Sequence, residues 1–118
     1  MKSILYVDDD SAYRPLFVDA LKAGGYEVTS FETLKSIEGL EVKKLREYDL
    51  IILDGSIDAK KDGWKYVEKL NKMGINSLVL SASDLSEEFK DVPYLLKGRC
   101  LMFELVKEIS NIISEKRN

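Results

Sequence analysis

The segment DLIILDGS, residues 49–56, decides the fold of this chain. Its apolar residues, Leu50 to Leu53, end at the carboxylate of Asp54, which a glycine and a serine follow. A short, continuous apolar run bounded by turn residues is typical of a strand that is buried on both faces of a sheet. An acid at the carboxyl end of such a strand lies where open parallel sheets bind their ligands, although it can also simply cap the following loop.

Strand-like and helix-like patterns alternate outward from this segment. Besides the central run, apolar strands are expected at 2–7, 26–31, 77–81 and 93–96. Apolar residues at helical spacing, with glycine stops, predict helices at 16–21, 33–47 with a break at Gly39, 64–73, 84–90 and 101–113. Five strands that alternate with five helices indicate one α/β domain over residues 1–118, built on a parallel sheet.

The composition narrows the class of protein. With 118 residues, 45% of them hydrophobic, the chain can bury a full core without a disulfide or a structural metal. The formal net charge of -3 argues against nucleic-acid binding, and no apolar run is long enough to cross a membrane. The single cysteine fits a reducing compartment, so we expect a cytoplasmic protein. The absence of histidine excludes a histidine-based triad or metal site within the chain.

Polar groups follow four of the five expected strands. Asp8 and Asp9 come after the first strand, Asp54 after the third, Ser81 after the fourth and Lys97 after the fifth. In the doubly wound strand order 2-1-3-4-5, the first and third strands are neighbours, so the three aspartates meet at one edge of the sheet. Each of these residues alone can be a helix cap, a satisfied strand-end hydroxyl or a surface lysine. It is much less expected that polar or charged groups stand at four strand ends of one sheet by chance.

A pocket of three carboxylates favours one kind of chemistry. Like charges at close range repel, and a hard divalent cation such as Mg2+ neutralises them while it keeps waters and phosphate oxygens as further ligands. A lysine amine and a serine hydroxyl beside the pocket can hold a phosphoryl oxygen. We therefore expect an aspartate that accepts a phosphoryl group, with the metal and the lysine neutralising charge in the transition state.

These motifs resemble the receiver domains of two-component response regulators, over essentially the whole chain. The resemblance rests on ILYVDDD at 4–10, LIILDGS at 50–56, LVLSAS at 78–83 and YLLKG at 94–98. It implies a flavodoxin-like fold with a five-stranded parallel sheet of order 2-1-3-4-5, and Mg2+ as the cofactor. It also implies that the phosphoryl group comes from a phosphohistidine on a histidine kinase or a histidine phosphotransfer protein.

The resemblance gives a role to each matching residue near the metal. Asp54 is similar to the phosphoacceptor of the family, and Asp9 to the direct Mg2+ ligand. Asp8 is similar to the acid that holds the metal through water, and the backbone carbonyl of Ser56 to a further ligand.

The resemblance also implies a switch. Ser81 is similar to the hydroxyl residue that moves toward the phosphoryl group, and Lys97 to the lysine that bridges to it. Tyr94 matches the aromatic switch position, although it is equally well explained as a core or edge-strand aromatic. Since no output segment follows residue 118, we expect another protein to read the conformational change.

Three features depart from the family pattern. Asp58 stands where the family often has proline, in an unusually polar loop. Gly98 follows Lys97 where the family usually has proline after a cis bond, so we expect either a trans bond with a rearranged loop or a strained cis bond. Only residues 82–92 connect the fourth and fifth strands, so the fourth helix, at 84–90, should be two turns at most.

Two further hypotheses remain open at this point. The departures at Gly98 and in the fourth crossover fit a pseudo-receiver that no longer cycles and acts as a protein-binding module. Asp8 and Asp10 form a D-x-D pair after the first strand, which fits a small aspartate-dependent phosphatase of the haloacid dehalogenase type. Against the phosphatase, the chain is short for that family and Ala12 stands where its threonine or valine would be.

Overall fold

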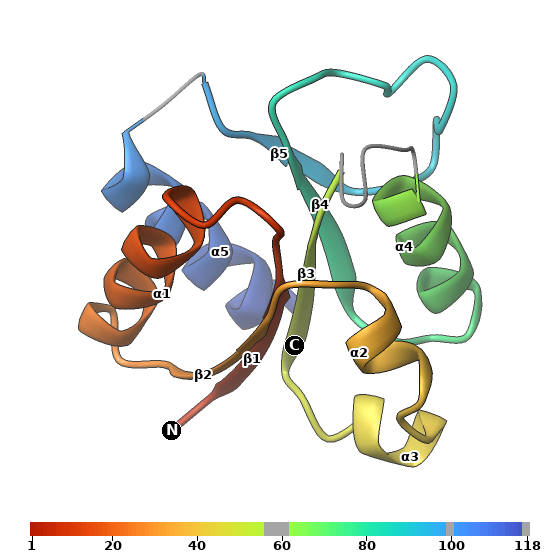
Figure 1. The fold of residues 1–118 in the computed structure, drawn as a ribbon, viewed down its shortest axis with the longest axis horizontal. Helices are drawn as coiled ribbons and strands as arrows, with labels where there is room; N and C mark the ends of the chain where they lie inside the picture. Colours follow the sequence, from red (N-terminus) through yellow and green to blue (C-terminus); the bar gives the residue numbers. More distant parts are fainter. Residues whose placement is uncertain (56–61, 99–100, 117–118) are drawn as a thin grey trace.

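Five parallel strands form one sheet in the order β2-β1-β3-β4-β5 in the computed structural model, which describes residues 1–55, 62–98 and 101–116 (Figure 1). The strands are β1 (Ser3–Val7), β2 (Glu27–Phe31), β3 (Leu50–Asp54), β4 (Ser77–Ser81) and β5 (Tyr94–Leu96). Two of the interior strands, β3 and β4, are buried along their whole length, as expected for a parallel sheet that is covered on both faces. The predicted doubly wound order is confirmed.

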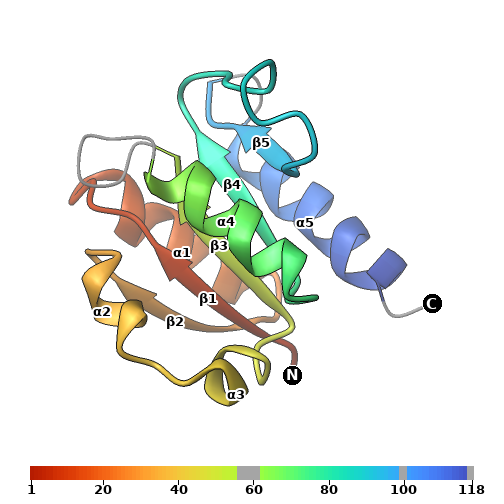
Figure 2. The same cartoon turned by 90° about the vertical axis from the view of Figure 1, so that its right-hand side faces the viewer.

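Helices cover both faces of the sheet. They are α1 (Tyr13–Ala23), α2 (Lys35–Glu38), α3 (Val42–Leu45), α4 (Asp62–Lys72) and α5 (Met102–Lys116). In Figure 1, α1 and α5 lie to the left of the sheet, whereas α2, α3 and α4 lie to its right. Figure 2 shows α4 running in front of the sheet, with α5 beyond β5. None of the described helices is long and apolar enough to cross a membrane.

Alternate side chains of each strand enter two separate cores. On β1, Ile4 and Tyr6 pack with α1 and α5, while Leu5 and Val7 pack with α2, α3 and α4. This alternation follows from the two-residue period of a strand, which sends successive side chains to opposite faces. Since all four residues are fully buried, the last residues of β1 hold the polar segment that follows in a fixed place.

Glycines end two of the helices where the sequence predicts a stop. α1 ends before Gly24, and the next residue, Gly25, has a φ of 96°. α4 ends two residues before Gly74, whose φ is 76°. Such positive φ values favour glycine, because a side chain there clashes with the backbone. The predicted helical region 33–47 is split into α2 and α3 on either side of Gly39, as expected.

The segment between β4 and β5 differs from the prediction. Residues 84–90, expected to form a short fourth helix, are not helical and consist of turns. One hydrogen bond of α-helical type remains, from Phe89 N to Leu85 O at 3.0 Å. A tighter turn follows it, closed by a hydrogen bond from Val92 N to Phe89 O at 3.2 Å. Since Phe89 and Val92 both enter the core beside α4, the short connection buries apolar side chains instead of completing a helix.

Candidate functional site

Three aspartates meet at the carboxyl edge of the sheet. Asp8 directly follows β1 and Asp54 is the last residue of β3, and these two strands pair so that Val7 lies beside Leu53. Carboxylate oxygens of Asp8, Asp9 and Asp54 all lie within 4.8 Å of one another. Asp8 and Asp54 are buried, whereas Asp9 is exposed, so the group has two interior acids and one at the surface.

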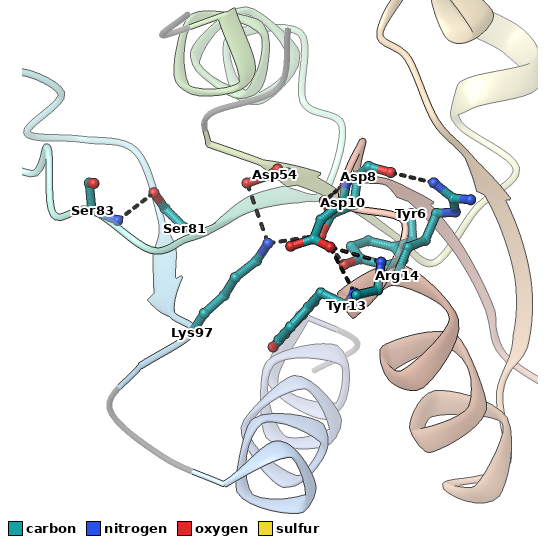
Figure 3. Close-up of polar contacts among 10 residues, drawn as sticks. Tyr6, Asp8, Asp10, Tyr13, Arg14, Asp54, Ser81, Ser83 and Lys97 are labelled. Atoms are coloured by element: carbon teal, nitrogen blue, oxygen red, sulfur yellow. Dashed lines mark hydrogen bonds and ion pairs between the residues drawn. The ribbon is translucent and has the colours of Figure 1, made fainter. Parts of the chain in front are cut away.

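Lys97 reaches this group from the end of β5 (Figure 3). Its backbone N–H donates to Ser81 O at 2.9 Å, which fixes the start of the side chain beside β4. Its Nζ lies 2.9 Å from Asp8 Oδ2 and 3.6 Å from Asp54 Oδ1. All peptide bonds among the described residues, including the one before Gly98, are trans. The trans alternative therefore holds, and the lysine nevertheless reaches both acids.

Asp8 accepts hydrogen bonds on both of its oxygens. Its Oδ2 accepts from the Tyr6 hydroxyl as well as from Lys97, and its Oδ1 accepts from the backbone N–H of Asp10 at 2.9 Å. Burial, followed by the nearby charge of Asp8, raises the pKa of Tyr6 far above its usual value. Tyr6 therefore stays protonated at any physiological pH and acts as a permanent donor to this carboxylate.

Asp10 serves the helix rather than the pocket. Its Oδ1 accepts from the backbone N–H groups of Ala12 at 2.9 Å and Tyr13 at 3.0 Å, which caps the start of α1. These two hydrogen bonds lower the pKa of Asp10 below its usual value, because they favour the charged form. Of the consecutive acids 8–10, the third thus orients α1, while the first two face Asp54.

Ser81 and Tyr94 lie on the face of the sheet that α4 covers, Ser81 at the end of β4 and Tyr94 at the start of β5. Ser81 is buried, and its Oγ accepts from the backbone N–H of Ser83 at 3.1 Å. Tyr94 is half-buried and packs on Trp64, with ring centroids 5.4 Å apart, while its hydroxyl donates to Asp84 Oδ2 at 3.5 Å. Tyr94 therefore connects the core beside α4 with the turn segment that replaces the expected fourth helix.

Two glycines let α4 approach the site closely. A Cβ added to Gly55 would lie 2.5 Å from Trp64 Nε1 and 2.6 Å from Ser81 Oγ. A Cβ added to Gly63 would lie 2.1 Å from the backbone oxygen of Asp54. All three distances are far below ordinary contact, so the residue after Asp54 and the second residue of α4 have no room for a side chain.

The donor set fits a magnesium ion. Three carboxylates offer the hard oxygen ligands that Mg2+ prefers, and the exposed position of Asp9 leaves room for the waters that this ion keeps. Asp8 already receives three donors, so it is better suited to hold an ion through water than directly. Of the expected ligands, Ser56 lies outside the described residues, and so does Asp58, the departure from the family pattern in the following loop.

Several residues of the site were missed in the sequence. Tyr6 was read only as part of an apolar strand, although a tyrosine two residues before an acid lies on the same face of the strand and can reach it. Tyr13 lies with its ring under Lys97, at 4.3 Å from Nζ, and nothing in its sequence position signals that contact. Trp64 starts the helix predicted at 64–73 and has no further role in the sequence analysis, whereas it is fully buried beside Gly55.

Comparison with known proteins identifies the fold. No family model and no curated protein matches the sequence, but solved structures match over nearly the whole chain. A response regulator receiver domain protein from Clostridium thermocellum matches with a TM-score of 0.80 and 21% identity, over 99% of this chain and 98% of that one. A CheY-like receiver domain protein from Methanospirillum hungatei has a TM-score of 0.74 and 26% identity, over 99% and 97%.

An orphan response regulator of H. pylori is similar to the same extent. Its TM-score is 0.76, at 22% identity, over 95% of this chain and 96% of that one. The chain therefore has the fold of response regulator receiver domains, which agrees with the resemblance of its motifs.

Proposed function

We propose that this chain is a single receiver domain of a two-component system, which accepts a phosphoryl group on Asp54 in the cytoplasm. The donor is a phosphohistidine on a histidine kinase or a histidine phosphotransfer protein, and Mg2+ is the cofactor. The observation that carries the proposal is the meeting of Asp8, Asp9 and Asp54 within 4.8 Å, with Lys97 Nζ between two of them.

In the proposed reaction, an oxygen of the Asp54 carboxylate attacks phosphorus. The bond between phosphorus and the donor imidazole nitrogen breaks, and the imidazole leaves with the electron pair. Lys97 Nζ, 3.6 Å from Asp54 Oδ1, is placed to pair with a phosphoryl oxygen and neutralise its charge. Asp9 directly, and Asp8 through water, would hold Mg2+, which would supply positive charge to the other phosphoryl oxygens.

The signal arises in the residues around Ser81. A phosphoryl oxygen beside Asp54 would offer the Ser81 hydroxyl proton a new acceptor, which would draw toward Asp54 the oxygen that now accepts from the backbone N–H of Ser83. Since Tyr94 packs on Trp64 next to Ser81, a shift of this serine changes the packing of Tyr94 and of the turns at 84–91. Another protein then reads this surface.

The proposal is tested by incubating the protein with Mg2+ and acetyl phosphate and weighing it intact. We expect one added phosphoryl group in the wild type and none in Asp54→Asn. Asp19→Asn, which removes an exposed acid from α1, is the matched control and should be modified like the wild type. Absence of the added mass in the wild type, or its persistence in Asp54→Asn, overturns the proposal.

A second candidate is a pseudo-receiver that binds a partner without cycling. The turns that replace the fourth helix favour it, since they alter a face that receiver domains use for partners. This candidate predicts partner binding that is indifferent to Mg2+ and beryllofluoride. The protein treated with Mg2+ and acetyl phosphate also tests the phosphatase hypothesis, because that hypothesis predicts an acyl phosphate trapped on Asp8 instead of Asp54.

A further inference from the structure

Lys97 needs more than its two acids to stay in place. Its side chain is only 13% exposed, and the residue after it is Gly98, which leaves the backbone freer than proline would. An ammonium on a four-carbon chain has many rotamers, and a carboxylate alone fixes its distance but not its direction. Some further group must therefore limit where Nζ can go.

The ring of Tyr13 supplies that limit. Lys97 Nζ lies 4.3 Å from the centre of the ring, within the range of about 6 Å in which a cation is attracted to an aromatic face. Figure 3 shows Tyr13 below Lys97, with Asp54 and Asp8 above it. The amine is therefore held between two carboxylates and one ring face, which come from α1, β3 and the end of β1.

Tyr13 is itself held by a run of aromatic rings. It stacks on Phe17, with centroids 5.9 Å apart and planes 29° apart. Phe17 in turn meets Tyr6 edge to face at 5.0 Å, and the Tyr6 hydroxyl donates to Asp8. Because Asp8 also binds Lys97, the contacts close into a ring that starts and ends at the lysine. We call Tyr6, Phe17 and Tyr13 the α1-side aromatics.

We propose that Tyr13 is the positioning residue for Lys97. Its ring restricts the direction of the lysine side chain, which the backbone at Gly98 restricts less than a proline would. The placement of the lysine stands on the contacts above. The effect on phosphoryl transfer rests on the proposed function. Tyr13 acts here through the lysine that it orients.

Two variants separate the ring from the hydroxyl. Tyr13→Phe keeps the aromatic face and removes only the oxygen, whereas Tyr13→Leu removes the face. With acetyl phosphate and Mg2+, we expect Tyr13→Leu to be phosphorylated about tenfold more slowly than the wild type, and Tyr13→Phe to stay within about threefold. The Mg2+ concentration for half-maximal rate should be unchanged in both, since neither variant alters a carboxylate.

A second measurement follows the lysine without any phosphoryl chemistry. Trace labelling of amines with acetic anhydride, followed by peptide mass spectrometry, compares Lys97 with Lys72, an exposed lysine on α4. We expect the ratio of Lys97 to Lys72 labelling to rise several-fold in Tyr13→Leu and to stay near the wild-type ratio in Tyr13→Phe. If Tyr13→Leu does not fold, Tyr13→Met, which is unbranched and also lacks a ring, replaces it.

The outcomes distinguish the two proposals. If the wild type takes up no phosphoryl group, the proposed function fails, and the labelling ratio alone decides the role of Tyr13. If the Leu and Phe variants have the same labelling ratio and the same rate, whether both are normal or both impaired, the positioning role of Tyr13 is overturned.

Discussion

Aromatic residues lie on both sides of the aspartate group, but they are connected to it in different ways. On one side, the α1-side aromatics end in two directed contacts with charged groups, Tyr6 with Asp8 and Tyr13 with Lys97. On the other side, the ring of Trp64 stacks on that of Phe89, with centroids 5.6 Å apart, and its centroid lies 5.4 Å from that of Tyr94. We call Trp64, Phe89 and Tyr94 the α4-side aromatics.

The difference lies in what each set must satisfy. A hydrogen bond to a buried carboxylate tolerates little movement, because breaking it leaves a buried charge without its donor. The buried Nε1–H of Trp64, by contrast, has no hydrogen-bond partner among the described residues, so this ring is held by packing alone. One set is therefore tied to charged groups by directed contacts, whereas the contacts of the other set are ring packing. The predictions below test this contrast.

The largest effect is expected where α4 meets the site. Gly63→Ala places a methyl group 2.1 Å from the backbone oxygen of Asp54, so the helix or the strand end must move. We expect a loss of about 3 kcal/mol in the free energy of unfolding, measured in urea. Gly39→Ala is the control, since its Cβ would meet no atom within 4 Å and its φ is -82°. A Gly63→Ala protein as stable as the control would show that α4 is not tightly fitted.

The α1-side aromatics are broken by Tyr6→Phe. The variant keeps the ring but removes a buried hydrogen bond to a charged group, so we expect a loss of about 2 kcal/mol in the free energy of unfolding. Tyr26→Phe is matched to it, because Tyr26 packs in the same core but precedes β2 at the opposite edge of the sheet. Equal losses in both variants would mean that the bond to Asp8 contributes nothing specific.

A smaller effect is expected among the α4-side aromatics. Phe89→Leu keeps an apolar side chain but removes the stack on Trp64, which should lower the free energy of unfolding by about 1 kcal/mol. The emission of Trp64, the single tryptophan, should change with it. Phe103→Leu, at a side chain that is 67% exposed, should change stability by less than about 0.5 kcal/mol. A Phe89→Leu protein with unchanged stability and emission would contradict the stacked arrangement.

The smallest effect concerns the cap of α1 and depends on pH. Because the pKa of Asp10 is lowered in the folded protein, its charge stabilises the fold above its usual pKa of 3.8, and this contribution is lost as the pH falls through the lower folded value. Asp10→Ala should melt at a slightly lower temperature than the wild type at neutral pH, and the gap should narrow below about pH 4. Asp10→Asn caps without titrating, so its melting temperature relative to Asp10→Ala should not depend on pH. A gap that widens in acid would contradict the assignment.

The sheet could be predicted from the sequence because each strand carries its own signal. The run 50–53 is apolar and is followed by an acid, and polar groups stand at four strand ends. In a doubly wound parallel sheet, these positions bring the aspartates together at one edge. Glycines also explain where α1, α2 and α4 end. These features depend on residues that are close together in the chain, so the sequence alone is enough to find them.

The fourth crossover could not be predicted in the same way. Asp84 and Glu87 have capping-box spacing, which favours a helix at 84–90, and in the structure Asp84 does accept from the backbone N–H of Ser86 at 2.9 Å. The helix does not continue, because burial of Phe89 and Val92 within so short a connection outweighs local propensity. Tertiary packing of this kind leaves no mark on the spacing of residues.

The contacts of Tyr6 and Tyr13 were beyond the sequence for a related reason. Tyr6 lies in the apolar strand predicted at 2–7, and Tyr13 precedes the helix predicted at 16–21, so neither position indicates a role in the site. Their role depends on the direction of the Tyr6 hydroxyl and on the distance of Lys97 Nζ from the Tyr13 ring. Both are set by three segments that are far apart in the chain.

The shortness of β5 has a consequence for how the molecule behaves among its own copies. It is an outer strand of the sheet and spans only Tyr94–Leu96, so a neighbouring molecule that tried to extend the sheet there would find few free backbone groups to pair with. The opposite outer strand, β2, presents exposed Glu27, Thr29 and Ser30, which are poor partners for an incoming apolar strand. Both outer strands thus disfavour strand pairing between molecules, even when the protein is concentrated.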